Sequence, residues 1–542
     1  MKITLLITSF NSISQLVYTY LKDKNHKTDI VFATSLTRDK EIQDFNPDLI
    51  LCPFLKHYIP HAIYENYPTF VFHPGIKGDR GAYSLEYALN EKSWGGVILK
   101  VDKNYDGGDI FASFKFEMRD TYKASLYRNE IKKGFFDILD KFFKNYKEDT
   151  KTPQILNPLH KKPHAKIDWQ RDTTKEIVRK INMLDSYPGI EDEILGLTYH
   201  LFGAWEEEQL KSDKPKEILA KREGAICIST IDGAVWITHL KTTDGFKLPA
   251  TYVLKEKLKG VKEVRLPLLF DMSYKTFYEI SHTMDGDVAY LCFNFHNGAF
   301  MAEQCIRLKY AFEFLRESAK VIVLIGGRDF FSNGIHLNIL EDSKKNGEDG
   351  WSNINAMNDL VKSIIFADNV ITVASLHQNS GAGGVFLALA CDFVVGAKSA
   401  TINPHYKTLG LSGSEYHTYT LPKRVGRDMA TKLLDECLPI STPHAKKIGM
   451  IDEVFDNDGY FKTLREYTQN IIKDEDEFED FLYEKQDYLE ENEQMIEIAK
   501  EDEIKTMYPE FWDKKSPFHK LRYDFVYKVC PTKTPKRLKY NA

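Results

Sequence analysis

The stretch from residue 69 to residue 109 constrains the fold of this chain more than any other. An apolar run over 69–72 predicts a buried strand, and the His73-Pro74-Gly75 sequence after it predicts the turn that ends the strand. His73 is therefore expected at the C-terminal edge of a sheet, where open α/β sheets bind ligands. A second strand over 96–101 leads into the turn at 106–109, so Asp106 is expected to meet His73 there. Such an aspartate would orient the imidazole, and the histidine would then transfer a proton. For His73 alone, a buried and purely structural histidine is the alternative.

The first 150 residues alternate apolar strands with helices. Continuous apolar strands are expected over 3–8, 29–33 and 48–53, the pattern of a buried parallel sheet. This alternation predicts a doubly wound α/β domain over residues 1–150. The first turn is not G-x-G-x-x-G, which disfavours a nicotinamide dinucleotide.

The motifs of this domain resemble those of the formyl-tetrahydrofolate-dependent formyltransferases. The matching sequences are His73-Pro74, the Arg-Gly-Ala turn at 80–82 and the Asp-x-Gly-Asp turn at 106–109. The resemblance implies 10-formyl-tetrahydrofolate as the donor, with His73 and Asp106 as catalytic residues. It also implies a folate site made by Cys52, Pro53, Phe54, Leu55 and Arg80. For Cys52 we prefer a small buried apolar role to any thiol chemistry.

One position departs from the formyltransferase pattern. Val71 stands where that family has a catalytic asparagine, which donates a hydrogen bond to the formyl oxygen. Losing such a donor costs about 3 kcal/mol of transition-state stabilisation. Ordinary formyl transfer to an amine is therefore not the expected reaction.

A second domain is predicted over residues 165–265. A linker with three prolines precedes it over 151–164, and a helix is expected from Thr174. Short strands over 198–205, 225–229 and 234–240 then predict a small all-β barrel. The domain resembles the OB-like C-terminal domain of methionyl-tRNA formyltransferases, but it has no basic stripe for tRNA.

The remaining segment, residues 266–542, resembles the crotonase (enoyl-CoA hydratase/isomerase) superfamily. The matching motifs lie at 331–337, 383–392, 421–426 and 442–452. The resemblance implies a crotonase-fold α/β domain that binds coenzyme A, with Asn333 in the binding loop. It also implies that the backbone N–H groups of Ile335 and Gly383 form an oxyanion hole for a thioester.

The two glutamates that activate water in hydratases are absent. Their positions correspond to Phe386 and to Tyr406, or to His405 if the register slips by one. Water addition to a double bond is therefore not expected. Tyr416 is our candidate for a hydrogen bond to a small acyl oxygen or for proton transfer. Alternatively, Tyr416 only fills space vacated by an acyl chain. The other polar candidates nearby are His405, Tyr406, Glu415 and His417.

The fusion of the two halves resembles the HypX (HoxX) family of hydrogenase maturation factors over the whole chain. That resemblance implies an enzyme that makes the carbon monoxide ligand of [NiFe]-hydrogenase. The formyl group would pass from 10-formyl-tetrahydrofolate to coenzyme A, and formyl-CoA would then be decarbonylated. It also implies hydrogenase maturation proteins as partners. Two alternatives remain: a formyltransferase or hydrolase with a non-catalytic crotonase domain, and a folate- and CoA-sensing scaffold.

Composition limits the other classes of function. The net charge of −6 lacks the excess of basic residues expected of a nucleic-acid-binding protein. The seven cysteines show no metal-binding spacing. We expect no metal. With no apolar run of about 18 residues, no membrane span is expected and a cytoplasmic location is predicted. The basic stretch 528–539 is interpreted as a frayed terminus, with binding of CoA phosphates as the alternative.

Overall fold

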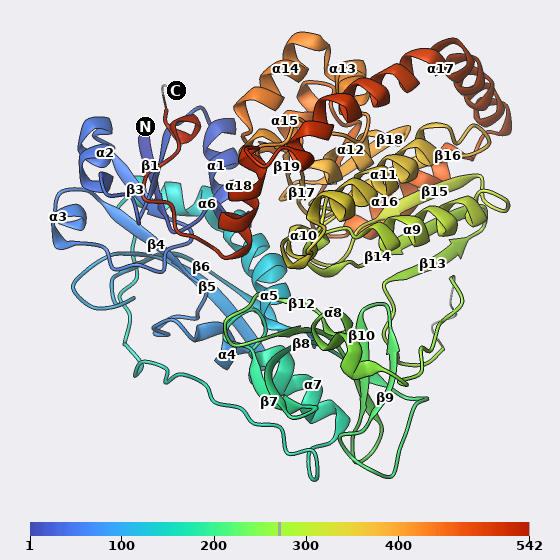
Figure 1. The fold of residues 1–542 in the computed structure, drawn as a ribbon. Coiled ribbons are helices and arrows are strands. Elements are labelled where there is room, and N and C mark those ends of the chain that lie inside the picture. The colour runs from blue at the N-terminus through green and yellow to red at the C-terminus, as the bar shows by residue number, and fades with distance from the viewer. Residues whose placement is uncertain (269–272, 541–542) are drawn as a thin grey trace. The chain divides into compact units, whose positions relative to one another are not determined.

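The computed structural model describes residues 1–268 and 273–540, which divide into two compact units (Figure 1). The first unit comprises Met1–Leu266 with residues 273–278 and 531–540. The second comprises residues 267–268 and Glu279–Cys530. Each unit is described by itself below.

The first unit begins with a six-stranded sheet in the order β2-β1-β3-β4-β5-β6. Its strands are β1 (Lys2–Ile7), β2 (Lys27–Phe32), β3 (Leu49–Cys52), β4 (Thr69–His73), β5 (Ser93–Lys100) and β6 (Ile110–Glu117). The first four are parallel, with helices α1 (Ser12–Asp23) and α2 (Arg38–Phe45) between them. The doubly wound domain is confirmed, and His73 ends β4 as predicted.

Strand β5 runs antiparallel to β4. The C-terminal ends of these two strands therefore do not lie side by side, contrary to what the sequence suggested. His73 pairs with Val97 in the middle of β5, whereas the end of β5 at Lys100 pairs with Phe70. A β-hairpin of β5 and β6 therefore closes this edge of the sheet. The turn at 106–109 reaches His73 only because the connecting loop folds back.

The helix α6 (Lys132–Lys147) packs against β6 through an apolar face, as its amphipathic pattern predicts. It follows the short helix α5 (Lys123–Leu126) and a π-helical turn, η1 (Tyr127–Ile131). Gly134 allows the close approach, since a Cβ there would lie 2.0 Å from the Phe114 ring.

An antiparallel sheet in the order β7-β8-β11-β10-β9 forms the other part of the first unit. The strands are β7 (Ile190–Ile194), β8 (Leu197–Glu207), β9 (Ile218–Arg222), β10 (Ala225–Ser229) and β11 (Ala234–Lys241); β12 (Leu248–Pro249) also pairs with β11. Helix α7 (Thr174–Met183) starts at a capping box made by Thr173 and Glu176. Its residues Ile177 and Ile181 are fully buried in the core of this sheet.

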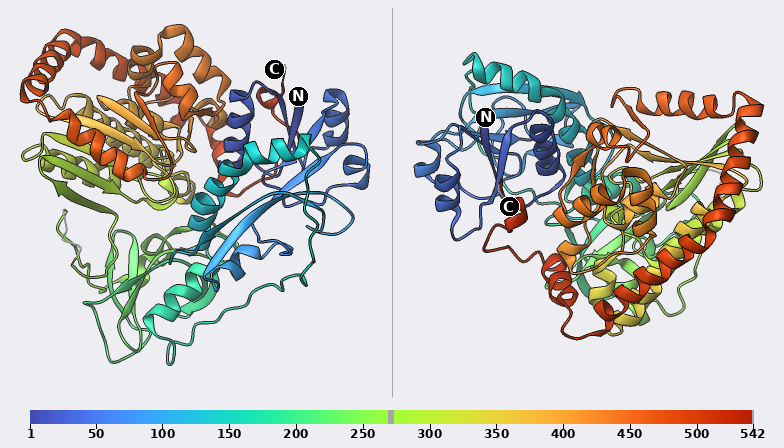
Figure 2. Two further views of the ribbon diagram at one scale, coloured as in Figure 1. Left: turned by 180° about the vertical axis from the view of Figure 1, so that it is seen from behind. Right: turned by 90° about the horizontal axis from the view of Figure 1, so that it is seen from above.

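The second unit is built on a sheet in the order β13-β14-β15-β16-β18-β21. Strands β14 (Val288–Phe293), β15 (Val321–Ile325), β16 (Ile371–Leu376), β18 (Phe393–Ala397) and β21 (Glu453–Phe455) are parallel, and β13 (Ile280–Asp285) is an antiparallel edge. A smaller sheet joins β17 (Ser380–Gly381), β19 (Thr401–Asn403) and β20 (Ile440–Ser441). The helices α9 (Ala302–Leu315), α11 (Asn346–Ile365) and α12 (Gly383–Leu389) lie near these strands. The long helix α17 (Glu475–Trp512) runs along the periphery of this unit (Figures 1 and 2).

The segment 531–540 packs on the first unit, so the predicted domain 266–542 does not coincide with the second unit. Lys539 Nζ lies 3.1 Å from Asp29 Oδ2 and 2.6 Å from Glu41 Oε2. The backbone N–H of Tyr540 donates to Asp29 over 2.9 Å. The interpretation of the stretch 528–539 as a frayed end is therefore wrong for residues 531–539. Within the described residues, no helix is both long and apolar enough to cross a membrane.

Candidate active sites

The first candidate site is built around His73, which is 5% exposed at the end of β4. The His73 Nε2 atom lies 2.6 Å from Oδ2 of Asp79, a residue of the following turn. Ser84 Oγ, at the start of α4 (Ser84–Ala88), lies 2.5 Å from the same carboxylate oxygen. Asp79 is 3% exposed, so this contact is shielded from water. Shielded hydrogen bonds between charged groups are stronger than exposed ones.

The protonation state of Asp79 determines which nitrogen of His73 can act as a base. Burial alone raises the pKa of Asp79, but hydrogen bonds from His73, Ser84 and His160 outweigh it and the pKa is lowered. Asp79 is therefore an ionised acceptor at neutral pH, and the His73 Nε2 atom must carry the proton that it donates. In a neutral imidazole the other nitrogen, Nδ1, is then unprotonated and can accept a proton.

Asp106 faces that second nitrogen of His73. Its Oδ2 atom lies 3.6 Å from His73 Nδ1, outside hydrogen-bond range but close enough to stabilise an imidazolium. The Gly81 N–H donates to Asp106 Oδ2 over 2.9 Å and holds the carboxylate in place. Asp106 has a φ of 50°, a conformation that aspartate tolerates better than most residues. The loop thus returns Asp106 to His73 despite the antiparallel β5.

The sequence reasoning missed two residues of this arrangement, Asp79 and His160. His160 Nε2 lies 2.6 Å from Asp79 Oδ1, although 81 positions separate the two residues along the chain. For Asp79 a signal was present, because an acid in a tight Gly-Asp-Arg-Gly turn six residues after a candidate base is in reach of it. For His160 no local pattern pointed to the site.

Gly75 is needed for the contact between His73 and Asp79. A Cβ at this position would lie 2.1 Å from Asp79 Oδ2 and 2.4 Å from His73 Nε2, so the pair would have to separate. We expect Gly75→Ala to lower the rate of formyl transfer, the reaction that the sequence resemblance implies for His73, about 100-fold, since a displacement of about 1 Å costs that much. The rate is compared with that of Gly196→Ala, where a Cβ meets nothing within 4 Å but the φ of 80° makes alanine strained, so this control is expected to lose stability and to keep its rate. Equal rates in the two variants at equal thermal stability would contradict this role of the pair.

The predicted folate loop follows β3. Cys52 is buried at the end of the strand, and burial raises the pKa of its thiol, consistent with an apolar role. The Thr8 N–H donates to the Phe54 carbonyl over 2.9 Å, which ties this loop to the end of β1. Arg80 donates from Nε to the Tyr105 carbonyl over 2.7 Å and so braces the loop that carries Asp106. Pro53 and Leu55 lie in the same loop after β3.

The second candidate site lies in the second unit, where two backbone segments meet. A Cβ on Gly334 would lie 3.1 Å from the amide nitrogen of Gly383, so the N–H groups of Ile335 and Gly383 belong to adjoining segments. Within the described residues neither N–H donates to a protein acceptor. Asn333 Nδ2 donates to the Asn297 carbonyl over 2.7 Å, and this contact braces the loop. Two unsatisfied N–H groups in adjoining segments are what an oxyanion requires.

The carboxyl group of Glu415 lies next to Gly383. A Cβ on Gly383 would lie 2.7 Å from Glu415 Oε1 and 2.8 Å from Oε2. The side chain is 1% exposed, and burial raises its pKa. Glu415 has a φ of 62°, and its N–H donates to Asn358 Oδ1 over 2.8 Å. A non-glycine residue held in this conformation is uncommon and is frequently associated with function.

The two positions of the missing hydratase acids are filled by stacked aromatic rings. Phe386 and Tyr406 lie with ring centroids 5.3 Å apart at an interplanar angle of 13°. The Tyr406 hydroxyl contacts Glu415 Oε2 and lies 3.1 Å from the Ser414 carbonyl. The Tyr406 hydroxyl has one proton, so it donates either to the Ser414 carbonyl or to the Glu415 carboxylate.

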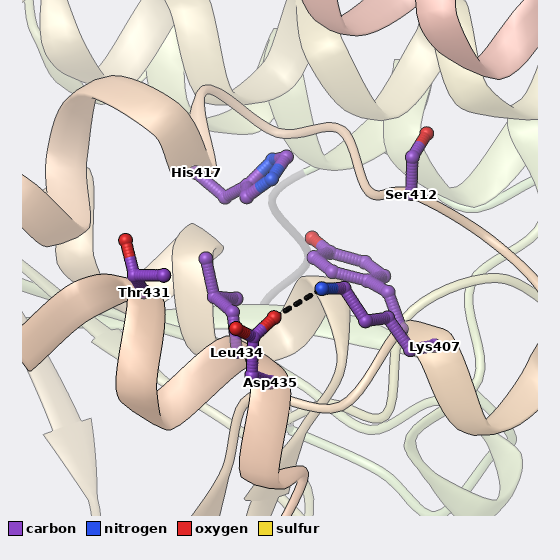
Figure 3. A pocket seen from close by; sticks show the side chains of 7 residues that line it. Lys407, Ser412, His417, Thr431, Leu434 and Asp435 are labelled. Atoms are coloured by element: carbon purple, nitrogen blue, oxygen red, sulfur yellow. Dashed lines mark hydrogen bonds and ion pairs between the residues drawn. The ribbon is translucent and has the colours of Figure 1, made fainter.

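A pocket of about 200 Å³ lies beside Tyr406 (Figure 3). The side chains of His417 and Leu434 point into it, and an ion pair between Lys407 and Asp435 lies along its wall. Ser412 and Thr431 complete the lining. A Cβ on Gly413 would lie 2.5 Å from the Tyr406 ring and 2.8 Å from His417 Cε1, so this wall is closely packed.

Tyr416, the tyrosine singled out from the sequence, is fully buried. Its hydroxyl has no hydrogen-bond partner among the residues that the structure describes. Burial raises its pKa, as do the neighbouring acids Glu497, Asp359 and Glu503. Its N–H donates to Glu503 over 2.9 Å. Its catalytic role stays a prediction, and Glu415 is the group that lies against Gly383.

Comparisons with known proteins define the class of protein. Residues 160–258 match the formyl transferase C-terminal domain family, and residues 286–518 match the enoyl-CoA hydratase/isomerase family. The chain therefore combines a formyltransferase-type part with a crotonase-type part. Within the described residues, no group of three or more His, Cys, Asp and Glu side chains is arranged to hold a metal ion.

Similarity over the full length defines the family. The chain is 33% identical to the hydrogenase maturation factor HoxX of Bradyrhizobium diazoefficiens, covering 99% of this chain and 96% of that protein. A crystal structure of HypX from Aquifex aeolicus in complex with tetrahydrofolic acid is 38% identical and superposes with a TM-score of 0.95. That match covers 99% of this chain and 98% of the other. The chain belongs to the HypX/HoxX family of hydrogenase maturation factors.

Proposed function

We propose that this protein makes the carbon monoxide ligand of [NiFe]-hydrogenase from 10-formyl-tetrahydrofolate. Formyl transfer to the thiol of coenzyme A is the first step, and decarbonylation of formyl-CoA is the second. The proposal rests on membership of the HypX/HoxX family and above all on one observation. His73 is held by Asp79 so that its Nδ1 atom faces Asp106 and is free to take a proton.

The first step uses the first candidate site. His73 Nδ1 takes the thiol proton, and the thiolate attacks the formyl carbon. The bond from that carbon to N10 of the folate breaks, and the proton passes from His73 to the departing nitrogen. Asp106 stabilises the imidazolium while His73 carries the proton. A thiolate is a strong nucleophile, so the reaction tolerates Val71 in place of the asparagine that assists amine attack.

A folate ligand is supported by two observations. The related Aquifex protein forms a complex with tetrahydrofolic acid. In this chain the predicted pterin loop 52–55 leaves the same sheet as His73, because β3 and β4 are parallel neighbours. We assign Cys52, Pro53, Phe54, Leu55 and Arg80 to this site through their loop positions. Backbone groups of such loops bind a pterin by hydrogen bonds.

The second step uses the second candidate site. The N–H groups of Ile335 and Gly383 hold the formyl oxygen of formyl-CoA, and Asn333 positions their loop. An ionised Glu415 takes the formyl proton as the bond between carbon and sulfur breaks. Glu415 then returns this proton to the thiolate. The products are carbon monoxide and coenzyme A, so the step consumes neither water nor an oxidant.

The stacked pair of Phe386 and Tyr406 suits this reaction better than hydration. Neither ring can activate water, and two buried aromatic side chains leave room for a small acyl group only. The three atoms that lie nearest to a Cβ built on Gly383 all belong to the Glu415 carboxyl group. Because burial raises its pKa, its ionised form is a stronger base than an exposed glutamate.

The overall reaction predicts carbon monoxide from two substrates. Purified protein is mixed with 10-formyl-tetrahydrofolate and coenzyme A, and carbon monoxide is trapped with deoxyhaemoglobin. We expect the absorption change of carbonylated haemoglobin only when both substrates are present. Folate turnover that is equally fast without coenzyme A would instead support a formyltransferase or hydrolase with a non-catalytic second half. Binding of both ligands without turnover would support a sensing scaffold.

A further inference from the structure

The linker between the two sheets of the first unit contributes to the His73 site. Residues 154–161 contain no helix or strand, and this part of the chain is drawn in teal (Figure 1). Gln154 Oε1 accepts from the Gly78 N–H over 2.9 Å, and the Asn157 N–H donates to the Gly78 carbonyl over 3.0 Å. Gln154 Nε2 also donates to the Asp106 carbonyl over 3.1 Å. The linker is thus bound to both turns that carry the carboxylates of the site.

The glycines of these turns show how closely the linker packs. A Cβ on Gly78 would lie 2.5 Å from the Ile155 carbonyl oxygen, and one on Gly107 would lie 3.1 Å from Leu156 Cδ1. Gly78 has a φ of 88°, which most other residues avoid. These positions leave no room for side chains, so the linker is held at a defined distance from the turns.

His160 is the linker side chain that reaches the buried carboxylate. Its Nε2 atom lies 2.6 Å from Asp79 Oδ1, so each oxygen of Asp79 faces one imidazole. Its ring stacks on Tyr87 with a centroid distance of 4.0 Å and an interplanar angle of 19°. The Tyr87 hydroxyl donates to the Lys161 carbonyl over 3.3 Å, which fastens the next residue of the linker. His160 is therefore fixed by stacking and by a charge-assisted hydrogen bond.

We propose that His160 is a positioning residue of the formyl-transfer site, acting on His73 through Asp79. The proposal rests on the formyl transfer proposed above. His160 occupies Asp79 Oδ1, and this leaves Oδ2 to accept from His73 Nε2. The imidazole of His73 is thereby kept in the tautomer whose Nδ1 atom is the base. The linker is then part of the active site. The domain predicted over residues 1–150 therefore does not contain the whole site, because it lacks His160.

Removing His160 has a predictable electrostatic consequence. The charge of Asp79 would no longer be shared with a second donor, so Asp79 would stabilise the His73 imidazolium more strongly. The ionisable groups that these contacts bring together are His73, Asp79, Asp106, His160 and Tyr87, and Arg80 braces the loop that carries Asp106. Because His73 must be neutral to accept a proton, the acid limb of the rate profile should move to higher pH.

The test compares His160→Ala, His160→Gln and the control His164→Ala, which changes an exposed histidine of the same linker. We expect His160→Ala to lower kcat for formyl transfer about tenfold, the scale of losing an outer hydrogen-bond partner, with little change in KM. Its acid limb should lie at higher pH than that of wild type. His160→Gln keeps an N–H donor, so it should restore both rate and pH profile, and His164→Ala should match wild type.

Two outcomes would overturn the role of His160. One is a wild-type pH profile and rate in His160→Ala. The other is a loss of rate with an unmoved acid limb that His160→Gln does not restore, because this pattern indicates packing alone. If the wild-type protein transfers no formyl group, the proposed function is wrong. Nitrogen NMR of the His73 imidazole then tests separately whether His160 positions His73. A proton on Nε2 in wild type and a mixture of tautomers in His160→Ala would support the proposal; identical spectra would overturn it.

Discussion

Replacing Asp79 with asparagine should lower the rate of formyl transfer about 10⁴-fold while the protein stays folded, the scale known for triad aspartates. The introduced amide can donate to His73 Nε2, and the proton of the imidazole would then move to Nδ1. The base facing Asp106 would be lost, although every other group of the site stays in place. The measurement is the rate of tetrahydrofolate release from 10-formyl-tetrahydrofolate in the presence of coenzyme A.

The control for this experiment makes the same chemical change at Asp39. That residue is an exposed acid of α2, paired with Arg38, and its change to asparagine should leave the rate near that of wild type. The variant Asp106→Asn should lose less activity than Asp79→Asn, because Asp106 lies 3.6 Å from His73 and makes no hydrogen bond to it. A greater loss in Asp106→Asn than in Asp79→Asn would show that Asp106, and not Asp79, is the carboxylate that fixes the tautomer of His73.

The change Glu415→Gln should stop carbon monoxide release while formyl transfer continues. The amide keeps the size of the side chain, but it cannot take the formyl proton, and we expect a loss of about 10³-fold. Formyl-CoA should then accumulate, which chromatography of the acid-quenched reaction detects. Carbon monoxide production near the wild-type rate would remove Glu415 from the second step.

The matched variant Tyr416→Phe distinguishes the two neighbouring candidates. Its hydroxyl has no hydrogen-bond partner within the described residues, so its removal should cost the fold little. If Tyr416 only fills space, carbon monoxide release should stay within about threefold of wild type, well short of the loss for a proton-transfer group. If Tyr416→Phe instead loses as much activity as Glu415→Gln, the tyrosine predicted from the sequence takes part in the reaction.

The sequence alone was sufficient for the features encoded in short stretches of chain. Apolar runs ending in Pro and Gly located β4 and placed His73 at its end. The glycine-rich motifs located the segments that carry Ile335 and Gly383, whose backbones meet as the crotonase resemblance implies. Such features are local, because strand propensity, turn chemistry and close backbone approach depend on a few consecutive residues. They were enough to predict the α/β fold class and the family.

Only the tertiary structure decided which side chains meet. His73 contacts Asp79 directly, and Asp79 in turn contacts His160, which lies 81 positions after Asp79 in the chain. The carboxyl group beside Gly383 belongs to Glu415 and not to the tyrosine that follows it. These contacts depend on how loops fold back over a sheet, and a loop has no repeating pattern that reveals its partner. The sequence therefore determined the strands and the turns, whereas packing between distant segments determined the charges around each reacting group.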